Sequence, residues 1–437
     1  MNIRELIQTK IKRWPYWLIS VVMALSAFGA YTSMYAFRKA FTSATFEGLE
    51  FFNIDYKVWL VIFQVAGYTC SKFYGIRFIA SLKGDKRGRT VLLLIGISWL
   101  ALLFFAIIPP PWNILFLFIN GFPLGMIWGL IFGYLEGRRT TEFMAAVMSV
   151  SLIFASGFIK TTGRTMMEAY HVSEYWMPFL TGLLFVVPIL FFVLLLEYLP
   201  GPTEEDKLTR SERKPMSAHD RNNFARTFLP GIVLTLIIYV LLTVTRDIRD
   251  NFEVEIWKEL GVASANIYTI IDSFIALVVL LIISLLILIK NNSKAFTVIH
   301  LLIIAGCLLA GLSTFVFNQH YISGTTWMTL AGLGLYLAYI PYNAIFFERM
   351  IAAFKCKGNV GFVMYIADAA GYLGSITVLL FKEFGSSKDL NWNHFFKQGL
   401  MLVSVVGGLA AVCSLLYFRQ KKLQEKKENN SIQLLPA

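Results

Sequence analysis

Charged residues are scarce in this sequence, and their scarcity excludes an ordinary water-soluble globular protein. Only 15% of the 437 residues are charged, whereas 57% are hydrophobic. A typical soluble domain has about 25% charged residues. So large an apolar excess requires lipid around the chain.

Cysteine and histidine are also rare, and several catalytic motifs are missing. None of the cysteines has metal-ligand spacing to another, and we expect them to be small apolar residues: Cys70, Cys307, Cys356 and Cys413. The chain has neither a Gly-rich phosphate loop ending in Lys-Ser/Thr nor a His-Glu-x-x-His pair. We therefore expect no metal, no other cofactor and no enzymatic activity.

Long hydrophobic runs recur along the whole chain. Each has about 20 residues, enough to cross about 30 Å of hydrocarbon. Backbone groups in lipid must be hydrogen-bonded within their own segment, so these runs are expected to be helices. The sequence predicts an all-α polytopic membrane protein with about twelve transmembrane helices, at 17–39, 57–81, 90–109, 113–137, 143–167, 175–199, 228–248, 265–290, 295–318, 325–350, 359–383 and 395–418.

A polar, charged stretch at 200–227 divides these runs into six and six. We predict five parts: a cytoplasmic N-terminal segment (1–16), a first six-helix bundle (17–199), a cytoplasmic linker (200–227), a second six-helix bundle (228–418) and a disordered cytoplasmic tail (419–437). Two six-helix bundles joined in this way resemble the major facilitator superfamily. That resemblance implies a substrate near the middle of the bilayer, between the bundles.

The net charge of +12 is explained by the positive-inside rule rather than by nucleic acid, which we do not expect as a partner. Basic residues gather after every second run and in the tail, whereas the first outer connection carries Glu47, Glu50 and Asp55. Both termini are therefore expected to be cytoplasmic. The segment from Ser81 to Arg89, which reads SLKGDKRGR, resembles the superfamily's signature loop. The resemblance implies that Asp85 and Arg89 help to hold a cytoplasmic gate.

Two arginines, Arg38 and Arg246, lie within hydrophobic runs at matching places in the two halves. An arginine inside a bilayer costs at least about 2.5–3.5 kcal/mol on insertion scales, so a chain that keeps one there usually uses it. The guanidinium fork matches phosphate or carboxylate bidentately. The pair predicts an anion clamped between Arg38 and Arg246.

Four short motifs occur in order along the chain: YAFRK at 35–39, GYTCSKF at 67–73, Arg246 followed by Asp250, and GYLG at 371–374. Together they resemble the organophosphate:phosphate antiporters, which carry glycerol phosphate and hexose phosphates. The family's histidine in the fifth span has no match here. The resemblance implies a bacterial inner membrane, a small anionic solute as substrate and these substrate-binding residues: Arg38, Arg246, Lys72, Tyr35, Tyr68 and Tyr372.

Other interpretations stay open. Asp272 and Asp368 are either counter-ions of the basic residues or proton carriers that drive transport. The protein is then either an antiporter, a proton-coupled symporter of another organic anion, or a membrane sensor of a phosphorylated solute that does not transport. Lys39 is expected to extend to the outer membrane surface. We expect the protein to function in the lipid bilayer as a monomer.

Overall fold

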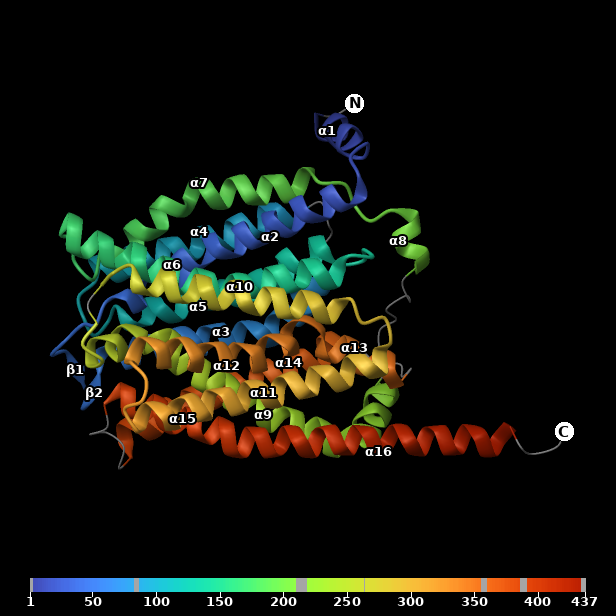
Figure 1. The fold of residues 1–437 in the computed structure, drawn as a ribbon. Coiled ribbons are helices and arrows are strands. Elements are labelled where there is room, and N and C mark those ends of the chain that lie inside the picture. Colours follow the sequence, from blue (N-terminus) through green and yellow to red (C-terminus); the bar gives the residue numbers. More distant parts are fainter. Residues whose placement is uncertain are drawn as a thin grey trace. The chain divides into compact units, whose positions relative to one another are not determined.

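A computed structural model describes residues 3–81, 86–209, 218–262, 264–354, 360–385 and 391–433 of the chain. The described residues are almost entirely helical (Figure 1). Ten of their helical segments are long and apolar enough to cross a membrane. This confirms the predicted all-α polytopic membrane fold.

The long helices follow the predicted hydrophobic runs. In the first half they are α2 (Tyr16–Arg38), α3 (Tyr56–Ser81), α4 (Arg87–Ile107), α5 (Ile114–Leu135), α6 (Thr141–Tyr170) and α7 (Met177–Tyr198). In the second half they are α9 (Ala218–Glu259), α10 (Ile267–Ile287), α11 (Asn292–Asn318), α12 (Gly324–Pro341), α14 (Val360–Phe384), α15 (Trp392–Leu402) and α16 (Gly408–Gln433).

Shorter elements connect or extend these helices. They are α1 (Ile3–Ile11), α8 (Glu204–Thr209), α13 (Phe347–Phe354), the 3-10 turn η1 (Ala40–Ser43) and the π-helical segments η3 (Tyr342–Phe346) and η4 (Val403–Gly407). Strands β1 (Glu50–Phe51) and β2 (Ile54–Asp55) form a small antiparallel hairpin in which Glu50 pairs with Asp55. The hairpin lies beyond the end of α2, in the connection between α2 and α3 (Figure 1).

The chain forms two compact units, and these units do not coincide with the N-terminal and C-terminal halves of the sequence. The first unit contains Met1–Glu212, Asp247–Ser284 and Tyr372–Phe396; the second contains Arg213–Arg246, Leu285–Gly371 and Lys397–Ala437. Parts of α9, α10, α14 and α15 therefore belong to the first unit together with all helices of the N-terminal half. The predicted division into two six-helix bundles at 17–199 and 228–418 stays a prediction.

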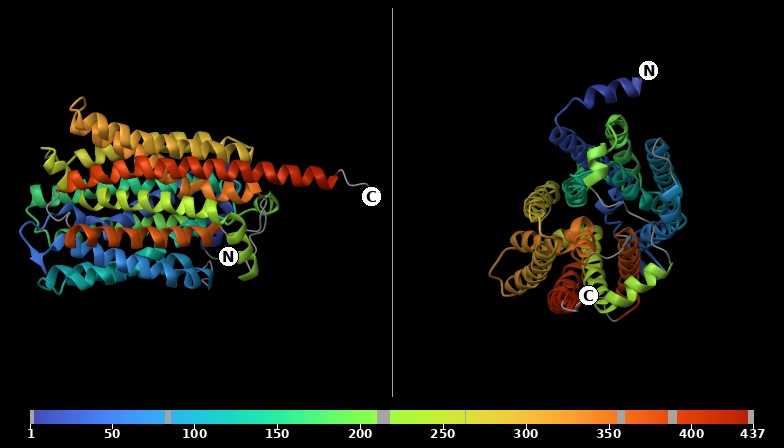
Figure 2. Two further views of the ribbon diagram at one scale, coloured as in Figure 1. Left: turned by 90° about the horizontal axis from the view of Figure 1, so that it is seen from below. Right: turned by 90° about the vertical axis from the view of Figure 1, so that its right-hand side faces the viewer.

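Close helix contacts in the first unit depend on glycine. A Cβ on Gly67 of α3 would lie 2.2 Å from the carbonyl oxygen of Phe118, and one on Gly121 of α5 would lie 2.2 Å from that of Gln64. Small residues let helix backbones in a membrane approach this closely. The long helices of this unit run in roughly the same direction (Figure 2), and the α3–α5 contact fixes Gln64 beside the end of α2.

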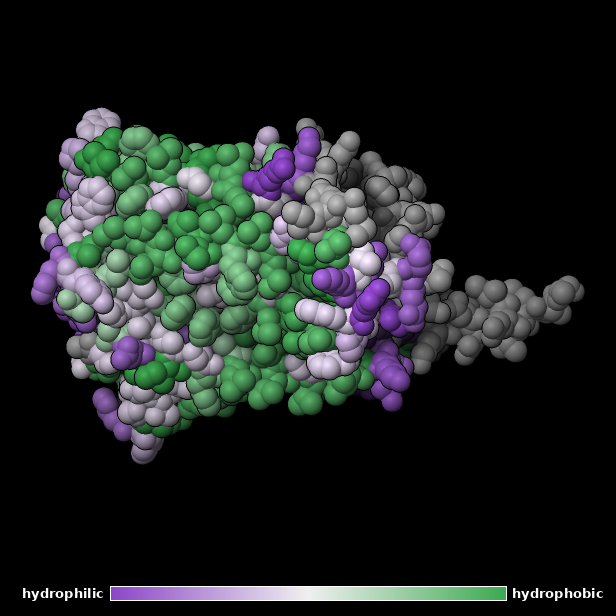
Figure 3. Space-filling model, turned by 90° about the horizontal axis from the view of Figure 1, so that it is seen from above, coloured by the Kyte–Doolittle hydropathy of each residue, from purple (hydrophilic) through white to green (hydrophobic). Residues whose placement is uncertain are grey.

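Apolar side chains cover the outside of the helices. On α7, Leu184, Val187 and Phe191 are 56%, 73% and 59% exposed. Figure 3 shows hydrophobic residues over the middle of the helices and hydrophilic ones toward their ends. This pattern fits a surface that faces lipid.

The connection after α7 is attached to the first unit through Asp206. Its carboxylate accepts hydrogen bonds from the Tyr16 hydroxyl at 2.6 Å, the Arg139 backbone N–H at 3.0 Å and Thr203 at 2.9 Å. Burial alone would raise the pKa of Asp206, but these hydrogen bonds outweigh it and lower the pKa to about 2.

The first part of the predicted tail is helical in the structure. Residues 419–433 were expected to be disordered, but they continue α16 as far as Gln433. Lysine, glutamine and glutamate fill this segment, and all three are good helix formers. The disorder and the cytoplasmic location of the tail stay predictions.

Candidate functional site

Arg38 occupies the last turn of α2 in the first unit and is 4% exposed. Its guanidinium carbon lies 4.0 Å from the ring centre of Tyr68 and 5.8 Å from that of Tyr35. Gln64 donates to the Arg38 carbonyl at 2.6 Å, which fixes the backbone there. Within the described part of the chain, no carboxylate forms an ion pair with Arg38, and its Nε has no hydrogen-bond partner.

Lys72 and Tyr372 complete this group of residues. Lys72 is 5% exposed, and its Nζ lies 5.1 Å from the centre of the same Tyr68 ring. The Tyr372 ring meets Tyr68 edge-on at 5.0 Å. Tyr68 is thus in contact with two cations, which an aromatic face attracts. We call Arg38, Lys72, Tyr35, Tyr68 and Tyr372 the Arg38 cluster.

Arg246 belongs to the second unit and is 5% exposed. Its guanidinium carbon lies 4.6 Å from the ring centre of Tyr339, which stacks on Tyr239 at 5.5 Å. The Tyr239 hydroxyl donates to Asp368 Oδ1 at 2.5 Å. The second arginine therefore also lies on a tyrosine ring, with an acidic residue bonded to the neighbouring tyrosine.

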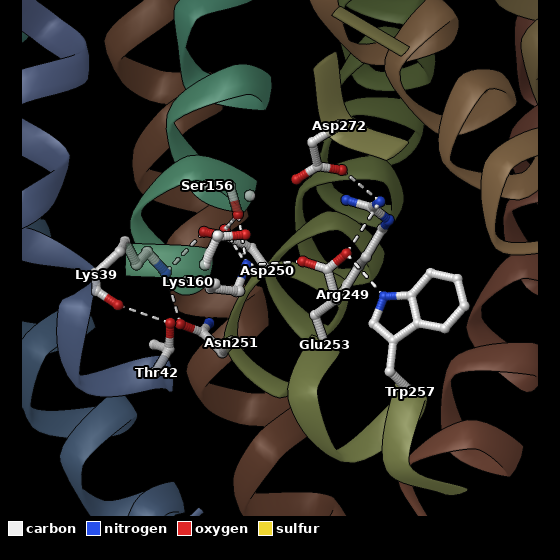
Figure 4. A network of polar contacts seen from close by, with 12 residues as sticks. Lys39, Thr42, Ser156, Lys160, Arg249, Asp250, Asn251, Glu253, Trp257 and Asp272 are labelled. Atoms are coloured by element: carbon white, nitrogen blue, oxygen red, sulfur yellow. Dashed lines mark hydrogen bonds and ion pairs between the residues drawn. The ribbon is translucent and has the colours of Figure 1, made fainter. Parts of the chain in front are cut away.

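A chain of buried ion pairs lies in the first unit (Figure 4). Lys39, just after α2, is 1% exposed and lies 2.8 Å from Asp250 Oδ2. Lys160 of α6 lies 3.4 Å from Asp250 Oδ1 and 2.9 Å from Glu253 Oε2. The expectation that Lys39 extends to the surface was wrong, because a buried carboxylate binds it.

The series of buried ion pairs continues through α9 to α10. Arg249 Nη2 lies 3.3 Å from Glu253 Oε1 and 2.6 Å from Asp272 Oδ1, and all three side chains are 0% exposed. Asp272 Oδ2 has no hydrogen-bond partner among the described residues. Nearby, Lys57 of α3 pairs with Glu255 at 2.5 Å. We call these eight residues the buried charge network: Lys39, Lys57, Lys160, Arg249, Asp250, Glu253, Glu255 and Asp272.

Sequence reasoning missed most of this network. It singled out Asp272 as a counter-ion or proton carrier, but not Arg249, to which Asp272 is bonded. A usable signal was present, since six of the ten residues from 246 to 255 are charged, at the end of a hydrophobic run. Such a density of charge inside or beside a membrane span is costly unless the charges are paired.

The predicted cytoplasmic gate is only partly described. Asp85 lies outside the described residues, and Arg89 is exposed on the first turn of α4. The neighbouring Gly88 N–H donates to Glu197 Oε1 at 2.9 Å, so the start of α4 is attached to α7. The gating role of Asp85 and Arg89 stays a prediction. In the described ranges, no three His, Cys, Asp or Glu side chains are grouped to hold a metal ion.

A family model matches residues 40–421, which is most of the chain. Its description is "Family of unknown function (DUF5690)". This chain belongs to that family. No curated protein matches the sequence.

Several solved transporters have a similar structure. A mutant of the peptide transporter POT in complex with alafosfalin has a TM-score of 0.60 at 13% identity, covering 97% of this chain and 99% of its own. The inward-open xylose transporter XylE from E. coli has a TM-score of 0.59 at 13% identity, covering 90% and 94%. The major facilitator superfamily transporter FucP has a TM-score of 0.54 at 13% identity, covering 90% and 98%.

At such low identities these similarities show the fold alone. The DUF5690 chain therefore has the major facilitator superfamily fold and is an integral, multi-pass membrane protein. Membership of the organophosphate:phosphate antiporter branch, which the motifs resemble, stays a prediction.

Proposed function

We propose that this protein is a secondary transporter of a small organic anion, with an organophosphate or phosphate as first choice. The observation that carries the proposal is the buried guanidinium of Arg38, which lies near Lys72 and itself has no carboxylate partner in the described ranges. Two cations around one aromatic ring repel each other and have lost most of their hydration. An anion beside Arg38 would supply the opposite charge that its guanidinium lacks among the described residues.

The geometry favours a phosphoryl or carboxylate group. Arginine offers paired N–H donors that bind either group bidentately. Tyr35 and Tyr372 carry hydroxyls that can donate further hydrogen bonds to anionic oxygens, whereas Tyr68 contributes the ring on which both cations lie. Phosphate is our first choice because the YAFRK, GYTCSKF and GYLG motifs contain all five residues of the Arg38 cluster and resemble the organophosphate antiporters.

Arg246 remains part of the proposal as the second arginine that acts on the anion. Its place on the Tyr339 ring repeats, in the second unit, the arrangement of Arg38 on Tyr68. Transport would then follow the alternating-access scheme of this fold, in which the two bundles rock around the site. The protein would need no enzymatic step.

The test is exchange in proteoliposomes loaded with radiolabelled phosphate. External phosphate, glycerol phosphate or a hexose phosphate should release the label from wild-type vesicles. Arg38→Lys and Arg246→Lys should each slow the release about tenfold to hundredfold, since a hydrogen bond to a charged group contributes about 1.5–3 kcal/mol. Arg164→Lys is the matched control, because Arg164 is partly exposed and pairs with Glu168 on its own helix.

Near-normal exchange by both lysine variants would contradict the arginine sites. Tight binding of a phosphorylated solute without exchange would identify the alternative, a membrane sensor. No exchange and no binding of any phosphate compound by correctly folded protein would favour the other alternative, a proton-coupled symporter of another organic anion.

A further inference from the structure

In the buried charge network, the lysines and the carboxylates come from different parts of the sequence. Its lysines, Lys39, Lys57 and Lys160, all precede the 200–227 linker, whereas its four carboxylates all follow the linker. Arg249 is the one network cation on the C-terminal side. Four cations thus face four carboxylates, so that the network is neutral while it is closed.

We infer that the buried charge network is a proton-binding gate, in which Glu253 and Asp272 share one proton when the lysines move away. The inference rests on the proposed transport, because alternating access requires the N-terminal and C-terminal helices to part. Parting would separate α9 and α10 from α2, α3 and α6. The ion pairs that cross between the two halves of the chain are the ones that break.

Two network pairs do not cross between the halves. Arg249 and Glu253 lie one turn apart on α9, and Asp272 lies on α10, the next helix in the chain. When Lys160 moves away, the Arg249 guanidinium is the one cation in the described ranges that still pairs with Glu253 and Asp272, and Glu253 also keeps its hydrogen bond from the Trp257 indole N–H at 3.3 Å. Two carboxylates on one cation leave an excess negative charge, and a carboxylate next to a like charge binds a proton more readily.

The structure favours Asp272 as the residue that takes this proton. Its Oδ2 has no hydrogen-bond partner among the described residues, whereas Oδ1 accepts from Arg249. Protonation at Oδ2 therefore leaves the Arg249 hydrogen bonds to Asp272 and Glu253 in place. The charged or titratable groups that face Asp272 are Arg249 and Glu253 of α9, Lys160 of α6 and, one turn away on α10, Tyr268.

The released lysines have a complementary role. The charge of Lys39 interacts with that of Arg38, so its released ammonium group would become available to an anion at the Arg38 cluster. An incoming anion could then replace Asp250 as the partner of Lys39. The network would close again only with the proton released, which couples movement of the anion to movement of a proton.

The experiment compares uptake with and without an imposed pH gradient. Proteoliposomes would be given radiolabelled glycerol phosphate while the outside solution is about one pH unit more acidic than the inside. For each coupled proton, a gradient of this size can raise the accumulation of glycerol phosphate about tenfold. Wild-type uptake should rise with the gradient and fall back when an uncoupler is added. Asp272→Asn and Glu253→Gln should lose this stimulation but keep exchange of internal phosphate against external glycerol phosphate.

Two further variants guard against misfolding and general charge effects. Asp272→Glu keeps a carboxyl group and should keep the gradient stimulation. Glu168→Gln removes an exposed acid that pairs with Arg164 on α6, and it should behave as wild type. Size-exclusion chromatography would establish that each variant is folded.

The outcomes separate the two proposals. Wild-type exchange that no pH gradient stimulates, or stimulation that survives in both Asp272→Asn and Glu253→Gln, would overturn the proton gate and leave the transporter standing. Absence of exchange by folded wild-type protein would overturn the proposed transport and the gate with it.

Discussion

At the scale of single residues, the shared use of one aromatic ring is the central feature of the Arg38 cluster. The guanidinium carbon of Arg38 and the Nζ of Lys72 lie 4.0 Å and 5.1 Å from the centre of the Tyr68 ring. A desolvated cation–π contact contributes about 2 kcal/mol. The ring thus offsets part of the cost of keeping two cations in an apolar place.

This feature leads to a prediction about Tyr68. Tyr68→Phe keeps the ring and should change the half-saturation concentration for glycerol phosphate by less than about threefold. Tyr68→Leu removes the ring and should raise that concentration about tenfold, as expected for the loss of about 1–2 kcal/mol of cation–π stabilisation. Uptake assays across a concentration series measure both. Equal effects of the two substitutions would mean that the hydroxyl, rather than the ring, is the important group.

The sequence indicated the Arg38 cluster but not the buried charge network, for a physical reason. Tyr35 precedes Arg38 by three residues, and Tyr68 precedes Lys72 by four, so helix periodicity alone places each pair on one face. Lys160 and Glu253, in contrast, are 93 positions apart. No local pattern specifies which distant charge a buried lysine will meet.

At the scale of helices, α6 and α10 meet closely next to the network. A Cβ on Gly157 of α6 would lie 2.3 Å from the carbonyl oxygen of Tyr268, so only glycine allows this approach. One turn along, the hydroxyls of Thr161 and Thr269 are 2.7 Å apart. The sequence predicted both helices but not this contact, because Gly157 alone does not reveal which backbone it faces.

The contact allows α6 and α10 to be joined reversibly. In a background without the native cysteines, Thr161→Cys with Thr269→Cys should form a disulfide on mild oxidation, since the two side chains already touch. If the helices part during transport, oxidation should stop phosphate exchange and a reductant should restore it. Each single-cysteine variant is the control and should be insensitive to oxidation. Exchange that continues with the disulfide formed would mean that α6 and α10 do not separate.

Some features of α9 were beyond sequence reasoning. The helix is kinked at Phe252, where φ is −118° and ψ is 21°, although neither proline nor glycine is adjacent. The Phe252 ring stacks on Trp392 with 3.4 Å between ring centres. Proline, glycine or an inserted residue usually marks a kink. Here tertiary packing accompanies it, and a single sequence does not specify that packing.

At the scale of the whole molecule, the recurrence of long hydrophobic runs was enough to predict the fold class. Apolar runs separated by charged connections leave little choice but membrane-spanning helices, because lipid offers the backbone no hydrogen bonds. The orientation of these helices in the membrane is a separate prediction, which depends on basic residues in the connections rather than on packing.

Cysteine labelling in intact cells tests this orientation. Trp112 is 68% exposed and lies in a proline-rich connection without basic residues, whereas Arg419 begins the basic tail. Because Lys and Arg are retained on the cytoplasmic side, Trp112→Cys should react with a membrane-impermeant thiol reagent, and Arg419→Cys should react only after the membrane is permeabilised. The reverse pattern would place both termini outside the cell. The buried charge network would then close the cytoplasmic side of the transport path, and the proton that it binds would come from the cytoplasm.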